Sequence, residues 1–196
     1  MNILLLGANG QVGSALHSLL KNACTLTAAT RQEADFEKPD QLALFIRSIR
    51  PDVIINAAAY TAVDRAESEP DLAYMINAAA PELLAIEAEK LGATLIHYST
   101  DYVFEGQGQT PWRETDTPNP LSVYGKTKLE GEQKVLQACA KTFILRTSWV
   151  YSAGGHNFLK TILKAARTRE TLEVVDDQVG SPTGADLIAS VTQEII

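Results

Sequence analysis

Tyr124 and Lys128 are the residues whose types and spacing best suit chemistry in this chain. They are four positions apart in a segment predicted to be helical, so both side chains lie on one face of that helix. A phenol with an ordinary pKa of about 10 is a poor acid or base near neutrality, but a nearby cation lowers that pKa. The pair therefore predicts an acid–base group in which Lys128 favours the tyrosinate form of Tyr124. A solvated surface pair that arose by chance is the alternative.

A glycine-rich turn near the N-terminus is the second candidate site. Its sequence, GANGQVG at residues 7–13, follows a short apolar run and precedes a helical pattern. Glycine permits a tight turn and a close approach of the backbone to a pyrophosphate, and N–H groups at the start of the helix can bind the anion. The turn therefore predicts a dinucleotide site, with a tight strand-to-helix turn that binds nothing as the alternative.

The elements that must position these residues alternate along the chain. Apolar runs predict strands at residues 2–6, 24–30, 53–55, 93–99 and 142–147, and helical spacing predicts helices at residues 11–21, 39–48, 71–91, 122–140 and 156–169. Repeated strand–helix units of this length predict an α/β fold with a Rossmann-like, doubly wound parallel sheet. In such sheets ligands bind at the carboxyl ends of the strands, where the glycine turn also lies. His97 lies within one of the strands and is expected to be structural.

Composition excludes several classes of protein. The chain has 196 residues, of which 45% are hydrophobic and 21% charged, so it can bury a full core and form one domain with the start of a second. No apolar run is long enough to span a bilayer and no signal peptide is apparent, which predicts the cytoplasm. A net charge of −7 argues against a nucleic-acid surface. The two cysteines, Cys24 and Cys139, have no metal-ligand spacing and are expected to be free thiols.

Longer motifs give the chain a family resemblance. They are GQVG (residues 10–13), RPDVIINAAA (50–59), TAVD (61–64), AESEP (66–70), HYSTDYVF (97–104), PLSVYGKTKLEGE (120–132), RTSWVY (146–151) and DQVGSPTG (177–184). Together they resemble the dTDP-4-dehydrorhamnose reductase family of the extended short-chain dehydrogenase/reductase superfamily, nearly over the whole chain. The resemblance implies an NAD(P)H-dependent oxidoreductase. Its reaction would reduce the 4-keto group of dTDP-4-dehydro-6-deoxy-L-mannose to give dTDP-L-rhamnose, a precursor of surface polysaccharide such as lipopolysaccharide.

The same resemblance assigns roles at the reacting end of the site. Tyr124 would donate a proton to the sugar oxygen, Lys128 would bind the nicotinamide ribose, and Thr100 would hydrogen-bond the reacting carbonyl. Asp101 and Trp149 would contact the substrate together with Thr100. A strand-end turn, a loop cap and a core tryptophan are the respective alternatives for Thr100, Asp101 and Trp149.

The resemblance also assigns cofactor contacts, which are spread over the strand ends. Besides Tyr124 and Lys128 they comprise Gly7, Gly10, Gln11, Val12, Gly13, Asp35, Phe36, Ala58, Ala59, Tyr60, Thr61 and Tyr98. Core packing is the alternative for Phe36 and the alanines. At the end of the second predicted strand, where an acidic residue would bind a ribose 2′-hydroxyl, the chain has Arg31. A guanidinium can accept a 2′-phosphate, so we predict NADPH as the preferred cofactor, with NADH as the alternative.

Two departures from the family pattern affect the predictions. Many members have a glutamate linked to a magnesium-bridged dimer where this chain has Ala15, so we predict no metal. The family's chains also continue beyond residue 196. We therefore expect a Rossmann domain at residues 1–150, and interleaved elements with part of a substrate-binding lobe at residues 151–196. A dTDP-sugar is the expected partner, neither nucleic acid nor membrane is expected, and a homodimer remains open.

Two other functions compete with the reductase. The regulatory β subunit of methionine adenosyltransferase has a similar fold and motifs, binds NADP and serves as a partner-binding module. A related nucleotide-sugar epimerase or dehydratase would retain NAD⁺ and consume no cofactor. The Ser99-Thr100-Asp101 run and Trp149 favour the reductase over the regulatory subunit, and Arg31 counts against the epimerase.

Overall fold

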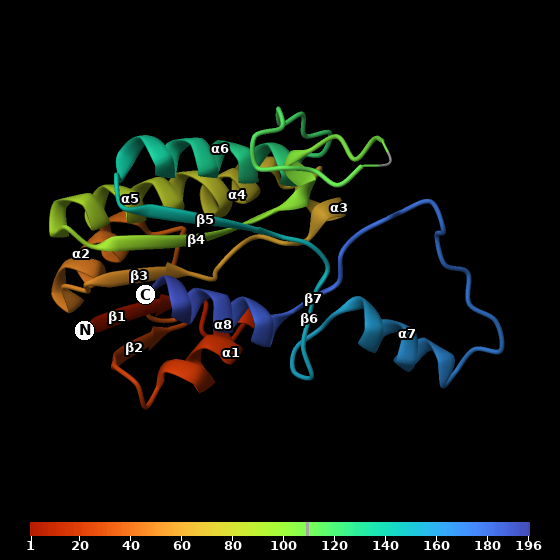
Figure 1. Cartoon of the computed structure of the whole chain (residues 1–196), viewed down its shortest axis with the longest axis horizontal. Coiled ribbons are helices and arrows are strands. Elements are labelled where there is room, and N and C mark those ends of the chain that lie inside the picture. Colours follow the sequence, from red (N-terminus) through yellow and green to blue (C-terminus); the bar gives the residue numbers. More distant parts are fainter. Residues whose placement is uncertain (109) are drawn as a thin grey trace.

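A parallel sheet forms the centre of the computed structural model, which describes residues 1–108 and 110–196. The strand order is β2-β1-β3-β4-β5 (Figure 1), and all neighbouring strands are parallel. The five strands are β1 (Asn2–Leu6), β2 (Thr25–Ala29), β3 (Val53–Asn56), β4 (Thr94–Thr100) and β5 (Thr142–Thr147). All of β3 is buried, as expected for a central strand of a sheet covered on both faces.

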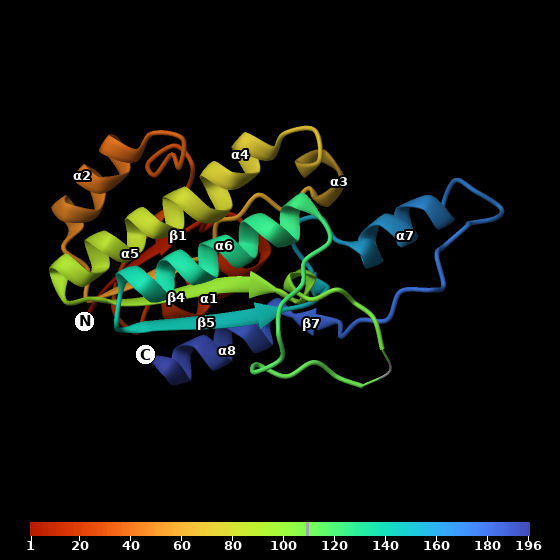
Figure 2. The same ribbon diagram turned by 90° about the horizontal axis from the view of Figure 1, so that it is seen from above.

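Helices cover both faces of this sheet (Figures 1 and 2). One face carries α2 (Pro39–Ile49), α5 (Ala80–Leu91) and α6 (Val123–Ala138), and the other carries α1 (Gln11–Leu20) and α8 (Ala185–Ile195). Short helices α3 (Val63–Ala66) and α4 (Pro70–Tyr74) lie near the start of α6. The predicted fold class, a doubly wound α/β sheet, is confirmed.

Alternating residues of the strands build a separate core on each face. Leu4 and Leu6 of β1 pack with Ile54, Leu84 and Val135 beneath α2, α5 and α6. The intervening Ile3 and Leu5 pack with residues of the opposite face, which include Leu16, Ile55, Ile96 and Ala189. This period of two explains why the strand runs are almost wholly apolar in sequence.

The helix predicted at residues 71–91 is longer and less regular than its apolar pattern suggested. It begins in α4, passes through a π-helical segment at Met75–Ala79 and continues as α5. Such π-helical segments are frequent at functional sites. Here the irregular turn carries Asn77, a fully buried amide.

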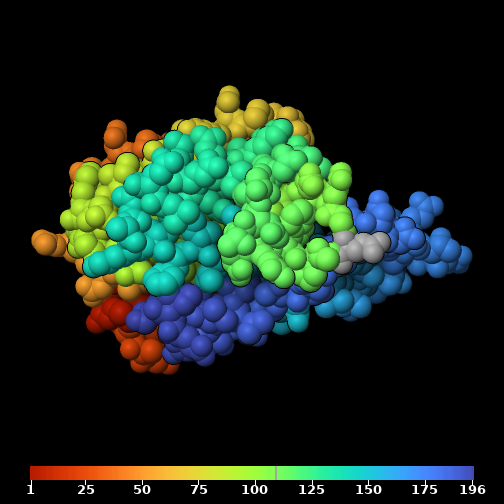
Figure 3. All heavy atoms as spheres, turned by 45° about the horizontal axis from the view of Figure 1, so that its top comes forward, coloured from red at the N-terminus to blue at the C-terminus, as the bar shows by residue number. Residues whose placement is uncertain are grey.

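Residues beyond β5 form a small extension and then return to the sheet. Strands β6 (Val150–Tyr151) and β7 (Thr183–Gly184) pair in parallel, and α7 (Phe158–Ala166) projects away from the body (Figures 1 and 3). No residue of α7 is buried. Helix α8, in contrast, packs Ala189 into the core beside α1. The C-terminal helix is therefore interleaved with the Rossmann-like layer, and the division near residue 150 stays a prediction.

Candidate active site

The glycine turn lies where the strand order reverses. From β1 the chain moves to β2 on one side and later to β3 on the other, which opens a crevice beyond the carboxyl ends of β1 and β3. A Cβ atom on Gly7 would lie 2.7 Å from the backbone of Ala57, and one on Gly13 would lie 2.1 Å from the Gly7 carbonyl oxygen. Gly7 also has a positive φ of 75°. The turn therefore needs glycine at both positions.

The start of α1 suits an anion. Gly10 is the N-cap residue without a side-chain cap, and the first turn of the helix contains no acidic residue. The first N–H groups are thus left to a ligand, and the helix dipole is not neutralised there. These features fit the pyrophosphate of a dinucleotide.

A pocket of about 250 Å³ adjoins the turn. It brings together many of the predicted adenosine contacts from three separate segments. Its lining includes Gly7, Gly10, Arg31, Asp35, Phe36, Ala58 and Ala59. Phe36 is 5% exposed and also packs in the core beneath α2, so the cofactor and packing interpretations of this ring are compatible.

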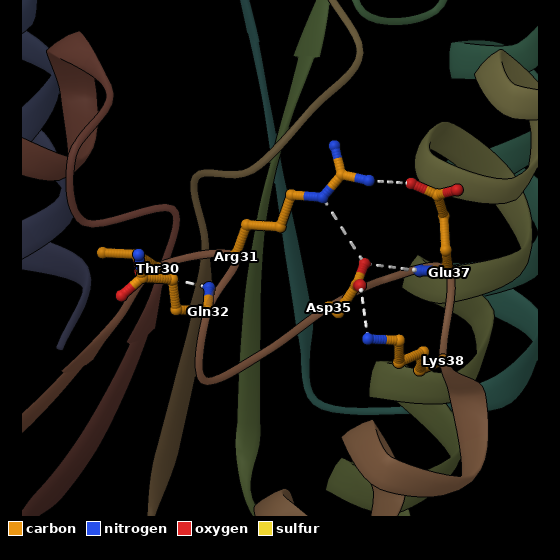
Figure 4. Close-up of polar contacts among 6 residues, drawn as sticks. All are labelled: Thr30, Arg31, Gln32, Asp35, Glu37 and Lys38. Carbon is orange, nitrogen blue, oxygen red and sulfur yellow. Dashed lines mark hydrogen bonds and ion pairs between the residues drawn. The ribbon is translucent and has the colours of Figure 1, made fainter.

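Charged side chains cluster at the rim of this pocket (Figure 4). The Arg31 guanidinium forms an ion pair with Glu37, and its Nε lies 3.6 Å from Oδ1 of Asp35. The Lys38 ammonium lies 3.3 Å from Oδ2 of Asp35. The Glu37 backbone N–H donates to Asp35 and lowers the pKa of that carboxyl. Glu37 is a pocket residue that sequence reasoning missed, because a charged residue in a turn gives no signal of its partner.

Tyr124 lies at the first turn of α6, close to the end of β4. Its ring is 8% exposed and meets the Tyr102 ring edge-on at 5.6 Å. Burial raises the pKa of Tyr124 to about 12, with a smaller opposing effect from the Thr100 hydroxyl. The prediction that Lys128 lowers this pKa is therefore wrong. Desolvation of the phenolate outweighs the other contributions.

Lys128 is directed away from the phenol, toward β4. Its ammonium donates to the Tyr98 carbonyl oxygen at 2.7 Å and lies 3.4 Å from Nε2 of His97. Burial lowers the pKa of Lys128 to about 8, and Glu132 opposes this effect. The imidazole is fully buried, and burial and the lysine keep the His97 pKa well below its ordinary value. His97 is therefore a neutral packing partner of Lys128, in line with its structural interpretation from sequence.

Thr100 and Asp101 meet at the carboxyl end of β4. The Thr100 hydroxyl donates to Oδ1 of Asp101 at 3.2 Å and accepts from the Tyr102 N–H at 3.2 Å. The other carboxylate oxygen of Asp101 accepts from the Ser148 hydroxyl at 2.6 Å. The structure thus places the Thr100 hydroxyl beside Tyr124, with the carboxylate held close by two hydroxyl donors.

A second pocket, of about 280 Å³, begins at Asp101. Trp149 lines it and is 42% exposed, with an unusual positive φ of 45°. Gly180 lies against the indole, since a Cβ atom there would come within 2.5 Å of the ring. Asp177 and Gln178, which precede Gly180, line the same pocket. The tryptophan is therefore presented at a cavity next to the Thr100 hydroxyl.

Some predicted residues are not brought to these pockets by their side chains. The Tyr98 hydroxyl hydrogen-bonds Thr192 of α8 at 2.6 Å, on the opposite face of the sheet from Lys128. The Gln11 side chain binds the loop after β6, through Val150 and Asn157. Val12 packs in the core beside α1. Any cofactor contact of these three residues would use other atoms, the backbone above all.

The loop after β3 is held by a residue that sequence reasoning missed. Both the N–H and the carbonyl of Tyr60 bind the side chain of Asn77, at 2.9 and 3.1 Å. The Tyr60 hydroxyl donates to Glu69 at 2.5 Å, and Thr61 is exposed. Asn77 was hidden within an apolar helical pattern, where a single amide gives no signal of its role.

Comparison with known proteins decides the family. A family model described as "RmlD substrate binding domain" matches residues 1–196. The chain is 53% identical to a dTDP-4-dehydrorhamnose reductase of Escherichia coli (strain K12), over 100% of this chain and 67% of that protein. The chain belongs to the dTDP-4-dehydrorhamnose reductase family. The family that the motifs predicted, and with it the oxidoreductase class, is confirmed.

Solved structures of other family members agree with this assignment. A dTDP-4-dehydrorhamnose reductase of Clostridium acetobutylicum superposes with a TM-score of 0.96 at 43% identity, over 100% of this chain and 70% of that one. The Bacillus anthracis reductase, solved in complex with NADP, gives a TM-score of 0.95 at 39% identity, over 98% of this chain and 69% of that one. The chain thus spans about two thirds of the length of these reductases.

Two kinds of feature are absent from residues 1–108 and 110–196. No helix there is both long enough and apolar enough to cross a membrane. Within the same residues, no group of three or more His, Cys, Asp and Glu side chains is placed to hold a metal ion.

Proposed function

We propose that this chain catalyses the NADPH-dependent reduction of the 4-keto group of dTDP-4-dehydro-6-deoxy-L-mannose to give dTDP-L-rhamnose. The observation that supports this reaction most is the meeting of Tyr124 and the Thr100 hydroxyl at the end of β4, between two pockets. One pocket adjoins the dinucleotide turn and the other contains Asp101 and Trp149. Family membership supplies the substrate class.

Tyr124 is the proposed general acid. Because burial raises its pKa to about 12, the phenol keeps its proton at neutral pH and can give it to the sugar oxygen. The Thr100 hydroxyl would hydrogen-bond that same oxygen and orient the carbonyl. When bound, the nicotinamide cofactor supplies the hydride. A raised pKa therefore suits reduction, in which the enzyme must start with a protonated acid.

Lys128 is the proposed ribose-binding residue and a store of positive charge. With a pKa of about 8 it is mostly an ammonium at neutral pH, although it is buried. That charge would stabilise the phenolate that Tyr124 becomes after it has donated its proton. The Tyr98 carbonyl oxygen holds the ammonium in place at 2.7 Å.

The remaining assignments follow the pockets. The turn at Gly7, Gly10 and Gly13 would bind the pyrophosphate, and the 250 Å³ pocket would hold the adenosine, with Arg31 at its 2′ position. Asp101 and Trp149 would contact the dTDP-sugar. Free Cys24 and Cys139 are consistent with the reducing cytoplasm as the site of this reaction. A homodimer remains a hypothesis, which sedimentation analysis would test.

Oxidation of NADPH by the keto sugar tests the proposal. The chain should consume NADPH only when the dTDP-keto-sugar is present, and dTDP-L-rhamnose should accumulate in equal amount. Binding of NADPH without consumption would favour the regulatory-subunit alternative. Sugar conversion without net loss of NADPH would favour the epimerase alternative, and either result would overturn the proposed reaction.

A further inference from the structure

The Arg31 guanidinium, the group expected to select NADPH, is already bound to carboxylates of its own chain. Glu37 is its closest partner and Asp35 the weaker one, with an Nε–Oδ1 separation of 3.6 Å (Figure 4). Both carboxylates and the guanidinium line the same pocket. A 2′-phosphate that approached Arg31 would therefore have to displace or join these anions.

The two carboxylates are not equivalent. Asp35 is held by the Lys38 ammonium at 3.3 Å and by the Glu37 N–H at 3.2 Å, and its side chain is 19% exposed. Glu37 has Arg31 as its one ion-pair partner among the described residues, and its side chain is 39% exposed. Asp35 is thus fixed by other groups, whereas the Glu37 carboxylate can be exchanged.

Charge explains what the exchange does. Arg31 and Lys38 balance Asp35 and Glu37, so the cluster of four residues has no net charge to attract a phosphate. A carboxylate at the ribose can accept a hydrogen bond from a free 2′-hydroxyl, whereas an arginine accommodates a 2′-phosphate. Arg31 and Glu37 place one group of each kind side by side.

We propose that Glu37 is a specificity-determining residue that competes with the 2′-phosphate of NADPH for Arg31 and accepts the 2′-hydroxyl of NADH. This inference rests on the proposed use of NADPH. Glu37 reduces the preference for NADPH that Arg31 alone would confer, so the pair makes the chain a dual-cofactor enzyme. Glu37 lies some way beyond the end of β2, where an acidic selector is usually sought.

Binding measurements on the full chain test this proposal without relying on turnover. Dissociation constants for NADPH and NADH, and for 2′,5′-ADP and 5′-AMP, would be measured by calorimetry for the wild type and for Glu37→Gln. The second pair of ligands differs only in the 2′-phosphate. We expect the ratio of the NADH to the NADPH dissociation constant to rise about three- to tenfold in Glu37→Gln, since a charged hydrogen-bond competitor is removed at a partly exposed site.

A matched control and a double-mutant cycle separate Glu37 from general charge effects. Asp40→Asn removes an equal charge at an exposed position in the first turn of α2, and should leave the ratio unchanged. The Arg31→Gln variant should bind NADPH more weakly than the Arg31→Gln/Glu37→Gln double variant. The reason is that the unpaired Glu37 carboxylate of the single variant would repel the phosphate.

The outcomes distinguish this inference from the proposed function. An unchanged ratio in Glu37→Gln, with a wild-type thermal unfolding midpoint, would overturn the role of Glu37 and leave the reductase proposal intact. An equal change in Asp40→Asn would reduce the effect to net charge and also overturn it. Failure of the wild type to bind either NADPH or NADH would overturn the proposed function itself, and this inference with it.

Discussion

The two ends of the crevice present charged groups in opposite ways. At the end of β4, Lys128 is 2% exposed and Tyr124 is 8% exposed. At the end of β2, the Arg31 side chain is 71% exposed and is bound by carboxylates. Burial therefore controls the protonation of the first pair, whereas pairing with neighbours controls the availability of Arg31.

This difference separates chemistry from selection. Burial moves the pKa of Tyr124 up to about 12 and that of Lys128 down to about 8, in each case in favour of the neutral form. Exposure leaves Arg31 charged but screened, where small changes in its partners alter affinity only modestly. Substitutions at the buried end should consequently have large effects on rate, and those at the exposed end small effects on preference.

The largest expected effect is that of Tyr124→Phe. Loss of the acidic proton should lower kcat by about 10²- to 10⁴-fold, the usual contribution of general acid–base catalysis. NADPH affinity should stay close to that of the wild type, because the ring is kept. Steady-state kinetics and calorimetry would measure the two quantities. Tyr151→Phe, at a 43% exposed tyrosine of β6, is the matched control and should retain full activity. Full turnover by Tyr124→Phe would remove the phenol from the mechanism.

Lys128 should make stability depend on pH. Its folded pKa of about 8 is below the ordinary 10.5, so between these values the unfolded chain binds a proton that the folded chain lacks. The free energy of unfolding therefore rises with pH across this window, by about 3 kcal/mol from this one group. Below pH 8 the fold has to hold a buried ammonium.

Urea unfolding of Lys128→Met tests this sign. The variant should be more stable than the wild type near neutrality, and its advantage should shrink as the pH rises from 8 toward 10.5. Lys126→Met, at an exposed lysine of the same helix, should show no such trend. A stability difference that is independent of pH would contradict the lowered pKa.

Glu132 offers the buried counterpart of the Arg31–Glu37 pair. Its carboxylate is 4% exposed and binds Arg146, whose Nε lies 2.9 Å from Oε1 of Glu132. Glu132→Gln should lower the free energy of unfolding by about 2 kcal/mol, because it leaves a mostly buried guanidinium without its anion. Chemical unfolding would measure this, with Glu130→Gln on the same helix as the control. A loss no larger than that of Glu37→Gln would show that burial does not separate the two pairs.

Sequence patterns predicted the sheet better than they predicted the partners within the site. Strands β1 and β5 have the bounds that their apolar runs predicted, because strands of a sheet covered by helices are largely apolar along their length. The YxxxK spacing located Tyr124 and Lys128 correctly on one helix. It could not show that Lys128 reaches the Tyr98 carbonyl, because that contact depends on how α6 packs on β4.

The residues that sequence reasoning missed share a physical cause. Glu37 and Asn77 act through partners that are brought close only by folding, at a turn and at a π-helical segment. A turn with several charges does not reveal which charges pair, and an amide in an apolar helix resembles an ordinary polar substitution. Tertiary contacts of this kind leave no periodic signal.

Ionic strength should have the smallest effect, and only at the exposed end. Between about 0.1 M and 1 M salt the Debye length falls from about 10 Å to about 3 Å, which screens a phosphate at Arg31. The ratio of the NADH to the NADPH dissociation constant should fall about twofold to threefold over this range. The fall should be steeper in Glu37→Gln, whose rim has a net positive charge to screen. With saturating cofactor and sugar, kcat should change less than this ratio, since Tyr124 and Lys128 are buried. A salt effect on kcat that exceeds the effect on the ratio would reverse the comparison between the two ends.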